Sequence, residues 1–294
     1  MAQSDTLYRY IFEDYQVRAE LVQLNETLQT ILSQRDYPPA IRTILAELLA
    51  ATSLLTATLK FEGDITVQLQ GTGTLHYVAI NGNNQQQMRG VARWDETSYQ
   101  DSDVLSELVG DNARLVITIA PANGERYQGI VALAEEGVAA SIENYFAQSE
   151  QLPTHLWLFF QDDKKSPCCA GLLIQQLPVK AHELSNDYQH IYELTRTATA
   201  QEIFTLPAEQ MLYRLYHQEK VRLFDPQPVE FACTCSKERC QAALFSMHED
   251  ELLSICEEQG AIAMHCEFCG SEYRFDKNAI TELFHGAANQ PKTH

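Results

Sequence analysis

Two stretches near the C-terminus decide how that part of the chain folds: Phe231-Ala-Cys233-Thr-Cys235-Ser-Lys-Glu-Arg239 and His265-Cys266-Glu-Phe-Cys269-Gly270. Zinc takes four tetrahedral ligands, and two close cysteine pairs that a fold brings together provide them. The C-x-x-C-Gly pair is the stronger signal, because glycine tolerates the backbone angles that turn N–H groups towards the sulfurs. The C-x-C pair is tighter and rarer in zinc sites. The spacing predicts one zinc ion per chain, bound as thiolates by Cys233, Cys235, Cys266 and Cys269.

Other kinds of cysteine site fit this spacing less well. A thioredoxin-like redox pair begins a helix inside a βαβ unit, whereas residues 271–275 after Cys269 read as a strand. The spacing matches neither common ferredoxin pattern for an iron–sulfur cluster. Cys240 is a fifth candidate ligand but is more typical of a packed or free thiol, and Cys256 lies on an apolar helix face. His265 could coordinate the metal, but four thiolates already complete the shell.

A second cysteine group, Cys168-Cys169, lies outside this region. Adjacent cysteines form only a strained disulfide. Pro167 precedes the pair and Asp162-Asp163-Lys164-Lys165 comes before it, so the sequence predicts incidental thiols in a surface loop.

Composition and charge exclude several classes of function. The 294 residues are 45% hydrophobic and 21% charged, as in a globular protein, but 40 acidic against 21 basic side chains give a net charge of -19. Such a surface repels phosphate backbones and anionic membranes. The acidic, aromatic segment 1–15 lacks the features of a signal peptide, and the apolar stretch 44–59 contains Glu47 and reads as a buried helix. We expect a cytoplasmic chain with reduced thiols, which favours metal binding or redox chemistry.

Hydrophobic periodicity predicts an α+β fold without a regular βαβ rhythm. A Gly71-Thr72-Gly73 turn suits a hairpin, Asn25 is a plausible helix N-cap, and Pro38-Pro39 opens a long helix with apolar positions from Ile41 to Leu55. The predicted strands are 18–24, 64–69, 75–80, 113–120, 127–133, 155–160 and 171–177, and a further predicted helix is 138–146.

Three domains are expected from the change in pattern along the chain. Residues 1–178 form a mixed sheet-and-helix core domain, 179–230 a helical, amphipathic and marginally stable linker, and 231–294 a small cysteine-rich zinc domain. The linker carries aromatic side chains that are expected to be exposed: Tyr188, Tyr192, Phe204, Tyr213, Tyr216 and Phe224.

The small size of the third domain suggests a switch. So few residues bury too little core, so the metal must supply much of the stability, on the order of 10–16 kcal/mol for structural zinc. Clustered thiolates are oxidisable. If oxidation joins each cysteine to its near neighbour, the two disulfides close only tiny loops and do not replace the long-range clamp. We hypothesise that oxidation melts the domain and the linker resting on it, while the net charge keeps the opened chain soluble.

At these residues the sequence resembles the 33 kDa chaperonin family of redox-regulated bacterial holdases. Besides the two cysteine stretches with Tyr273 and Phe275, the matching segments are Glu47-Leu-Leu-Ala-Ala-Thr-Ser-Leu-Leu55, Tyr127-Gln-Gly-Ile-Val131, Tyr145-Phe-Ala-Gln-Ser-Glu-Gln-Leu-Pro-Thr154, Ala170-Gly-Leu-Leu-Ile-Gln-Gln-Leu-Pro178 and Glu209-Gln-Met-Leu-Tyr-Arg214. They span nearly the whole chain in the family's order. Cys168-Cys169 departs from the pattern, which usually has small or polar residues before Ala-Gly. Extra thiols there could give side disulfides.

The resemblance implies a switch in more detail than the residues alone. The four matching cysteines would bind zinc in a reduced form that is inactive as a chaperone. Peroxide with heat, or hypochlorous acid, would form the disulfides Cys233–Cys235 and Cys266–Cys269. Zinc would leave, the linker would unfold, homodimers would form, and unfolding client proteins would be held without ATP.

Two other classes of function remain as alternatives. A zinc-ribbon nucleic-acid-binding or translation factor usually carries Lys and Arg around its ligands, but here four basic residues are outnumbered by acidic ones. A thiol–disulfide oxidoreductase would turn over small disulfides. The sequence contains no P-loop, G-x-S-x-G, H-E-x-x-H or calcium-loop motif, so we expect no enzyme and no catalytic residues.

Overall fold

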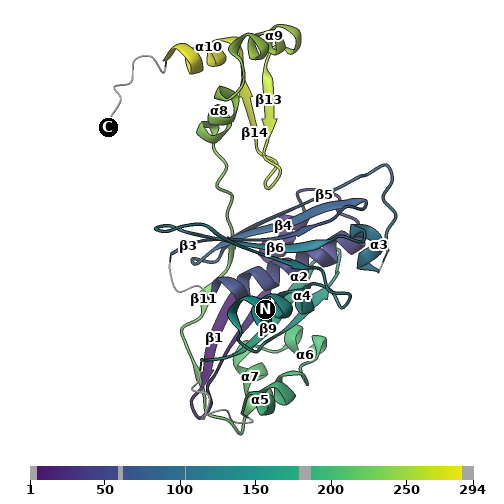
Figure 1. Ribbon diagram of the computed structural model, residues 1–294, viewed down its shortest axis with the longest axis vertical. Helices are drawn as coiled ribbons and strands as arrows, with labels where there is room; N and C mark the ends of the chain where they lie inside the picture. The colour runs from purple at the N-terminus through teal and green to yellow at the C-terminus, as the bar shows by residue number, and fades with distance from the viewer. Residues whose placement is uncertain (1–4, 59–61, 103, 179–186, 287–294) are drawn as a thin grey trace. The chain divides into compact units, whose positions relative to one another are not determined.

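The computed structural model describes residues 5–58, 62–102, 104–178 and 187–286 (Figure 1). The chain divides into two compact units, Met1–Ala232 and Cys233–His294, which we call the N-terminal and C-terminal units. Sheets and helices are mixed in each, so the predicted α+β class is confirmed. The three-domain division at 178 and 230 stays a prediction, because residues 179–186 lie outside the described residues.

The first sheet of the N-terminal unit has six strands in antiparallel pairs. Its order is β10-β1-β2-β9-β8, and β11 also pairs with β1. The predicted strands 18–24, 155–160 and 171–177 are confirmed, whereas β1 was not predicted. The bounds are β1 (Thr6–Phe12), β2 (Val17–Leu24), β8 (Thr154–Gln161), β9 (Cys168–Gln176), β10 (Val221–Leu223) and β11 (Gln227–Pro228).

The second sheet also has six strands, in the order β12-β5-β4-β3-β6-β7. The β3–β4 hairpin turns at the predicted glycines. Among the described strands of this sheet, β12 pairs with β5 in parallel and the other pairs are antiparallel. Strand β5 was not predicted, because Arg89, Gly90 and Arg93 interrupt its alternation of apolar and polar residues. The bounds are β3 (Gly63–Gln70), β4 (Leu75–Asn83), β5 (Gln87–Trp94), β6 (Arg114–Pro121), β7 (Tyr127–Ala132) and β12 (Glu230–Phe231).

Helix α2 (Pro39–Thr56) packs against strands of both sheets, β4 and β9 among them. By length and hydropathy α2 could cross a membrane, but 72% of its apolar window is buried in the structure, as in the core helix of a globular protein. The predicted buried helix is therefore confirmed. The buried cluster around α2, which we call the central core, includes Leu45, Leu49, Ile80 and Leu173. The other helices around it are α1 (Glu26–Leu32), α3 (Leu105–Val109), α4 (Val138–Tyr145) and the π-helical turn Phe146–Glu150.

The N-terminus of α1 is capped by a residue remote in sequence. Asn25 occupies the predicted N-cap position, but its side chain makes no capping hydrogen bond. Instead Asp5 Oδ1 accepts from the backbone N–H of Asn25 at 2.6 Å, and Asp5 Oδ2 accepts from that of Thr27 at 2.6 Å. A carboxylate beside these orphan donors also complements the helix dipole. The Asn25 amide points elsewhere and donates to Pro167 O at 2.7 Å.

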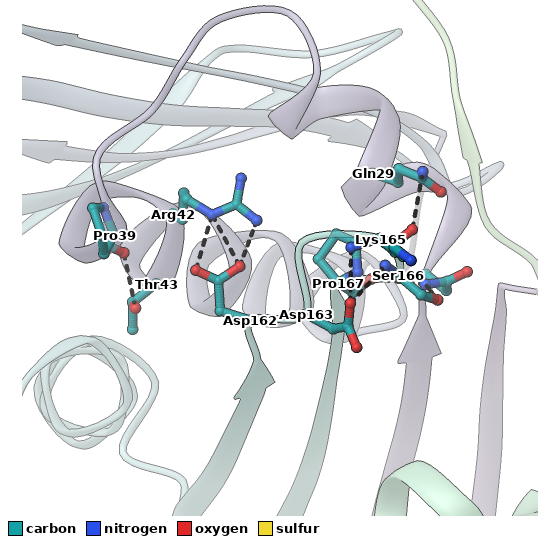
Figure 2. Close-up of polar contacts among 10 residues, drawn as sticks. Gln29, Pro39, Arg42, Thr43, Asp162, Asp163, Lys165, Ser166 and Pro167 are labelled. Carbon is teal, nitrogen blue, oxygen red and sulfur yellow. Dashed lines mark hydrogen bonds and ion pairs between the residues drawn. The ribbon is translucent and has the colours of Figure 1, made fainter.

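Side chains of α1 and α2 contact the loop between β8 and β9 (Figure 2). Arg42 of α2 forms a bidentate ion pair with Asp162, whose Oδ atoms lie 3.0 Å from Arg42 Nε. Gln29 of α1 donates to the backbone carbonyl of Lys165 at 3.5 Å. These contacts hold the loop against α1 and α2.

Strand β9 consequently begins at Cys168, and the predicted loop position of Cys168-Cys169 is wrong. Cys168 pairs with Gln161 and Cys169 with Phe160 of β8, and Cys169 pairs on its other side with Leu24 of β2. Cys169 is fully buried in the central core. Burial raises the pKa of both thiols, and that of Cys169 most strongly, so they are protonated and poorly reactive at neutral pH.

Helices from the predicted linker cover the outer face of the first sheet. Ile191, Ile203 and Met211 are fully buried against Phe12 and Leu172, in a cluster that we call the sheet–helix core. The bounds are α5 (Asp187–Thr195), α6 (Ala200–Thr205) and α7 (Ala208–Tyr216).

The prediction of exposed linker aromatics is correct for some residues only. Tyr213 is 73% exposed and Phe224 40% exposed. Tyr216 is buried, with its ring centroid 4.9 Å from that of Phe12. The three others are half-buried on the sheet–helix core: Tyr188, Tyr192 and Phe204. A helix has two faces, and the charged residues between these aromatics concealed which of them faces the sheet.

The C-terminal unit has a minimal core. Among its described residues, up to Gly286, five side chains are buried: Leu244, Leu252, Cys256, Phe275 and Ile280. The predicted core position of Cys256 is confirmed, and a strand follows Cys269 as expected. The bounds are α8 (Lys237–Phe245), α9 (Glu249–Gln259), β13 (Ile262–His265), β14 (Glu272–Phe275) and α10 (Lys277–His285), with β13 and β14 antiparallel.

Candidate metal centre

The C-x-C pair lies immediately before α8 and is held by the start of that helix. Ser236 is the N-cap, and its Oγ accepts from the backbone N–H of Arg239 at 3.3 Å. The Arg239 guanidinium reaches back and donates to Thr234 Oγ1 at 2.9 Å. Thr234, the residue between Cys233 and Cys235, is thereby joined to the first turn of α8.

The C-x-x-C-Gly pair forms the turn between β13 and β14. The Cys266 N–H donates to Ser271 O at 2.9 Å, and the Gly270 N–H donates to Cys266 O at 2.8 Å. Gly270 has a φ of 69°, in the left-handed region that favours glycine, as the sequence predicted. Burial raises the pKa of Cys266, and the backbone N–H groups of Phe268 and Cys269 only partly oppose it.

The turn and the C-x-C loop bring all four sulfur atoms to within 4.8 Å of one another. Cys233 Sγ lies 3.6 Å from Cys266 Sγ, and Cys235 Sγ lies 3.4 Å from Cys269 Sγ. A tetrahedral zinc ion with Zn–S bonds of about 2.3 Å separates its sulfurs by about 3.8 Å. The donor set is therefore positioned to hold a metal ion, and its size and softness fit zinc.

Two side chains contact the sulfurs, one from the residue just before β14 and one from β14 itself. Tyr273 Oη donates to Cys235 Sγ at 3.1 Å, and Ser271 Oγ lies 3.2 Å from Cys269 Sγ. Burial acts to raise the pKa of Cys269, but hydrogen bonds from the Ser271 hydroxyl and backbone outweigh it and lower this pKa to about 6. Cys269 is thus the thiol most ready to ionise.

The remaining three thiols resist ionisation without a cation. Burial raises the pKa of Cys233. The Tyr273 hydrogen bond acts to lower the pKa of Cys235, but burial and the neighbouring thiols raise it overall. Four adjacent negative charges repel one another, so a divalent cation is the natural partner that holds all four cysteines as thiolates.

The other candidates from the sequence lie outside this cluster. His265 pairs with Glu272, with Nε2 3.2 Å from Oε2, and is not among the four clustered ligands. Cys240 is half-buried on α8 against the small core, and the Cys256 thiol points to Phe275 O at 3.6 Å. Sequence reasoning did not assign contacts to Ser271 and Tyr273, although their alternation after Cys269 places both on one face of a strand.

Comparison with known proteins identifies the family. The family model described as Hsp33 protein matches residues 5–276. The chain belongs to the Hsp33 family. Hsp33 relatives named 33 kDa chaperonin, from Aeromonas salmonicida and Pectobacterium atrosepticum, are 51% and 52% identical over 97% of this chain and 96% and 97% of their own lengths. One from Yersinia pestis is 51% identical over 100% of both chains.

A solved Hsp33 structure has the same fold. The crystal structure of the 33 kDa chaperonin of Thermotoga maritima matches with a TM-score of 0.83, covering 98% of this chain and 100% of that chain at 17% identity. Membership of the Hsp33 family supports a chaperone function, and the names of the relatives are those of chaperones rather than enzymes.

Proposed function

We propose that this chain is a redox-regulated, ATP-independent holdase of the bacterial cytoplasm, inactive when reduced and zinc-bound and active after oxidation. The observation that carries the proposal is the cluster of four sulfur atoms within 4.8 Å in a member of a chaperone family. Cys233, Cys235, Cys266 and Cys269 would hold one Zn²⁺ in the reduced form. The metal would supply the stability that five buried core side chains cannot.

The chemistry of the switch is a four-electron oxidation of the thiolates. Two molecules of peroxide accept the electrons, four thiolates become two disulfides, and four hydroxide ions form. A disulfide sulfur is a poor zinc ligand, because only the thiolate donates a full lone pair to the metal, so zinc leaves. The chain performs no catalytic turnover in this scheme.

The pairing of the disulfides is proposed from the family resemblance. It gives Cys233–Cys235 and Cys266–Cys269, between near neighbours in the sequence. In the structure, sulfur contacts of 3.6 Å and 3.4 Å join Cys233 to Cys266 and Cys235 to Cys269, across the two loops. Neighbour pairing would remove the link between the two loops, whereas cross pairing would preserve it, so the pairing decides whether oxidation can open the unit.

The proposed consequence of opening is release of the 179–230 linker from the core domain 1–178. Helices α5 to α7 cover buried apolar side chains of the first sheet, including Tyr10, Phe12 and Leu21. Their release would expose an aromatic and aliphatic surface of the kind that unfolding clients bind. Exposed surface would also favour the oxidised homodimer, and the net charge of -19 would keep it soluble.

Light scattering from a thermally aggregating client tests the function. The reduced, zinc-loaded chain should leave aggregation unchanged, and the peroxide-treated, zinc-free chain should suppress it at a roughly equimolar ratio without ATP. Equal behaviour of the two forms would refute the switch. Salt-sensitive RNA binding by the reduced form would instead favour a zinc-ribbon function.

Disulfide mapping tests the chemistry separately. After peroxide treatment, peptide mass spectrometry should find the 233–235 and 266–269 pairs, one zinc released per chain, and four cysteines protected from alkylation. Cross-linked peptides joining Cys233 to Cys266 would contradict the opening mechanism even if zinc were lost.

A further inference from the structure

A cavity of about 910 Å³ opens in the N-terminal unit, and no cysteine is among its described lining residues. Its lining comes from the first half of α2, from α3 with the residues on either side, and from the loop between β7 and α4. The apolar part of the wall consists of Ile44, Leu105, Leu108, Val109 and Leu133. Val104 stands at the same cavity and is 51% exposed.

The charged side chains among the described lining residues of this cavity are all acidic. Its described lining residues include the carboxylates of Glu47, Asp111, Glu135 and Glu136 and no lysine, arginine or histidine. The last three are exposed. Acids and aliphatic side chains thus share one concave surface of a size that ligand sites commonly have.

Among these four acids, Glu47 has the surroundings least favourable to a negative charge. It lies on α2 between fully buried neighbours, Ala46 and Leu48, and is itself half-buried. Within the described part of the chain it forms no ion pair or hydrogen bond, and desolvation raises its pKa to about 7. A half-buried carboxylate without a partner costs stability, so its position favours an external cation.

The spacing of the acids argues against a single metal ion. Among the described residues, the four cysteines are the group of three or more potential ligands close enough to share an ion. The carboxylates around the cavity therefore do not converge on one point. An extended ligand that presents a cation to Glu47 and apolar groups to the aliphatic wall matches this distribution.

We propose that this cavity binds a short extended polypeptide segment with an arginine or lysine flanked by aliphatic side chains, its cation paired with Glu47. The long apolar stem of such a side chain would cross the aliphatic wall, and its charged head would meet the carboxylate. The site belongs to the folded N-terminal unit and uses none of the four metal-centre cysteines. It does not depend on the proposed switch, because it is complete in the reduced chain.

Calorimetry with the reduced, zinc-loaded full chain tests the site. The probe is the peptide acetyl-Gly-Leu-Arg-Leu-Gly-amide, and its partner is the same peptide with citrulline in place of arginine. We expect the arginine peptide to bind with one site per chain and the citrulline peptide to bind on the order of tenfold more weakly. Glu47→Gln should abolish that difference without unfolding the chain, since the amide keeps the shape of the side chain.

Two further variants control for general attraction to an acidic surface. Glu125→Gln removes an exposed charge in the turn between β6 and β7, at the far end of the hairpin from the cavity, and should bind like the parent. Ser106→Trp fills the cavity from an exposed position on α3 and should lose binding while keeping Glu47. Equal weakening in Glu47→Gln and Glu125→Gln, unchanged binding to Ser106→Trp, or equally tight binding of spermidine would each overturn the proposal.

Discussion

Tyr273 is the side chain that couples strand β14 to the sulfur cluster, through its hydrogen bond to Cys235 Sγ. Removal of the hydroxyl in Tyr273→Phe keeps the half-buried ring against the C-terminal core and removes only the donor. Groups that orient metal ligands typically contribute 10–100-fold to metal affinity. We expect zinc affinity to fall about tenfold, measured by competition with a chromogenic chelator.

The matched control for this substitution is Tyr213→Phe. Tyr213 is 73% exposed on α7 of the N-terminal unit, whereas the sulfur cluster belongs to the C-terminal unit. Zinc affinity should be unchanged in this variant. If Tyr273→Phe also bound zinc like the parent, the 3.1 Å contact would contribute nothing to metal binding.

Glu20 offers a pH-dependent prediction in the other unit. It is buried on β2, its Oε2 has no hydrogen-bond partner, and burial raises its pKa from 4.5 to about 7 although Arg18 and Arg9 act to lower it. Because the folded state keeps a proton that the unfolded state has lost, stability falls as pH rises from 4.5 through 7. The full penalty above pH 7 is about 3 kcal/mol.

Glu20→Gln should remove this dependence. At pH 5 the variant and the parent should unfold in urea at similar concentrations, and at pH 8 the variant should be the more stable by up to about 3 kcal/mol. Tryptophan fluorescence is the measurement, since Trp94 and Trp157 both lie in the N-terminal unit. Parallel pH profiles for the two proteins would show that the pKa of Glu20 is the same in the folded and unfolded states.

The sequence predicts individual residues well where the chemistry is local. Cys266, Cys269 and Gly270 form a turn whose geometry depends on adjacent residues, and that turn is present as expected. The cap of α1 depends instead on Asp5, twenty residues from Asn25 in the chain. A spacing rule cannot identify a donor or acceptor that only the folded sheet brings near.

At the scale of elements, the same contrast separates the strands that were predicted from those that were not. Strands β3, β4, β6 and β7 alternate apolar and polar residues between turn signals. Strand β1 mixes buried Tyr10 with exposed Arg9, and β5 contains Gly90, where an added Cβ would meet the Ile80 side chain at 2.4 Å. Such residues are determined by packing against neighbouring strands and not by a local sequence pattern. Strand propensity therefore does not predict these strands.

Helix α7 provides a prediction for the linker. Met211 is fully buried in the sheet–helix core. Met211→Ala therefore leaves a cavity beneath the helix. Such changes typically cost about 2–5 kcal/mol. Amide hydrogen exchange in α5 to α7 should accelerate while exchange in α2 stays unchanged.

Tyr213→Ala is the control on the same helix, because its side chain is 73% exposed. It should leave the exchange of α5 to α7 nearly unaltered. Equal acceleration in both variants would mean that the buried Met211 side chain holds these helices on the sheet no better than an exposed side chain does.

At the scale of the whole molecule, the two units depend on different sources of stability. The N-terminal unit has two extended cores built on two sheets, whereas the C-terminal unit buries five side chains and presents four sulfurs for a metal. Removal of zinc from the reduced chain should therefore unfold the C-terminal unit and leave the central core intact.

The two tryptophans separate these outcomes. Trp94 packs against Tyr37 at the central core, with ring centroids 5.5 Å apart, and Trp157 packs against Tyr192 of α5 at 5.7 Å. In Trp157→Phe the remaining tryptophan reports the central core, and in Trp94→Phe it reports the docking of α5. Zinc chelation should leave the emission of Trp94 unchanged in the first variant.

The emission of Trp157 in the second variant tests whether loss of the metal reaches the linker. If the helices detach when the C-terminal unit unfolds, Trp157 loses its aromatic neighbour and its emission should shift to longer wavelength on chelation and return when zinc is restored. An unchanged Trp157 spectrum, with the C-terminal unit unfolded by hydrogen exchange, would show that the helices stay docked without zinc. Opening of the client surface would then require the disulfides themselves rather than loss of the metal clamp.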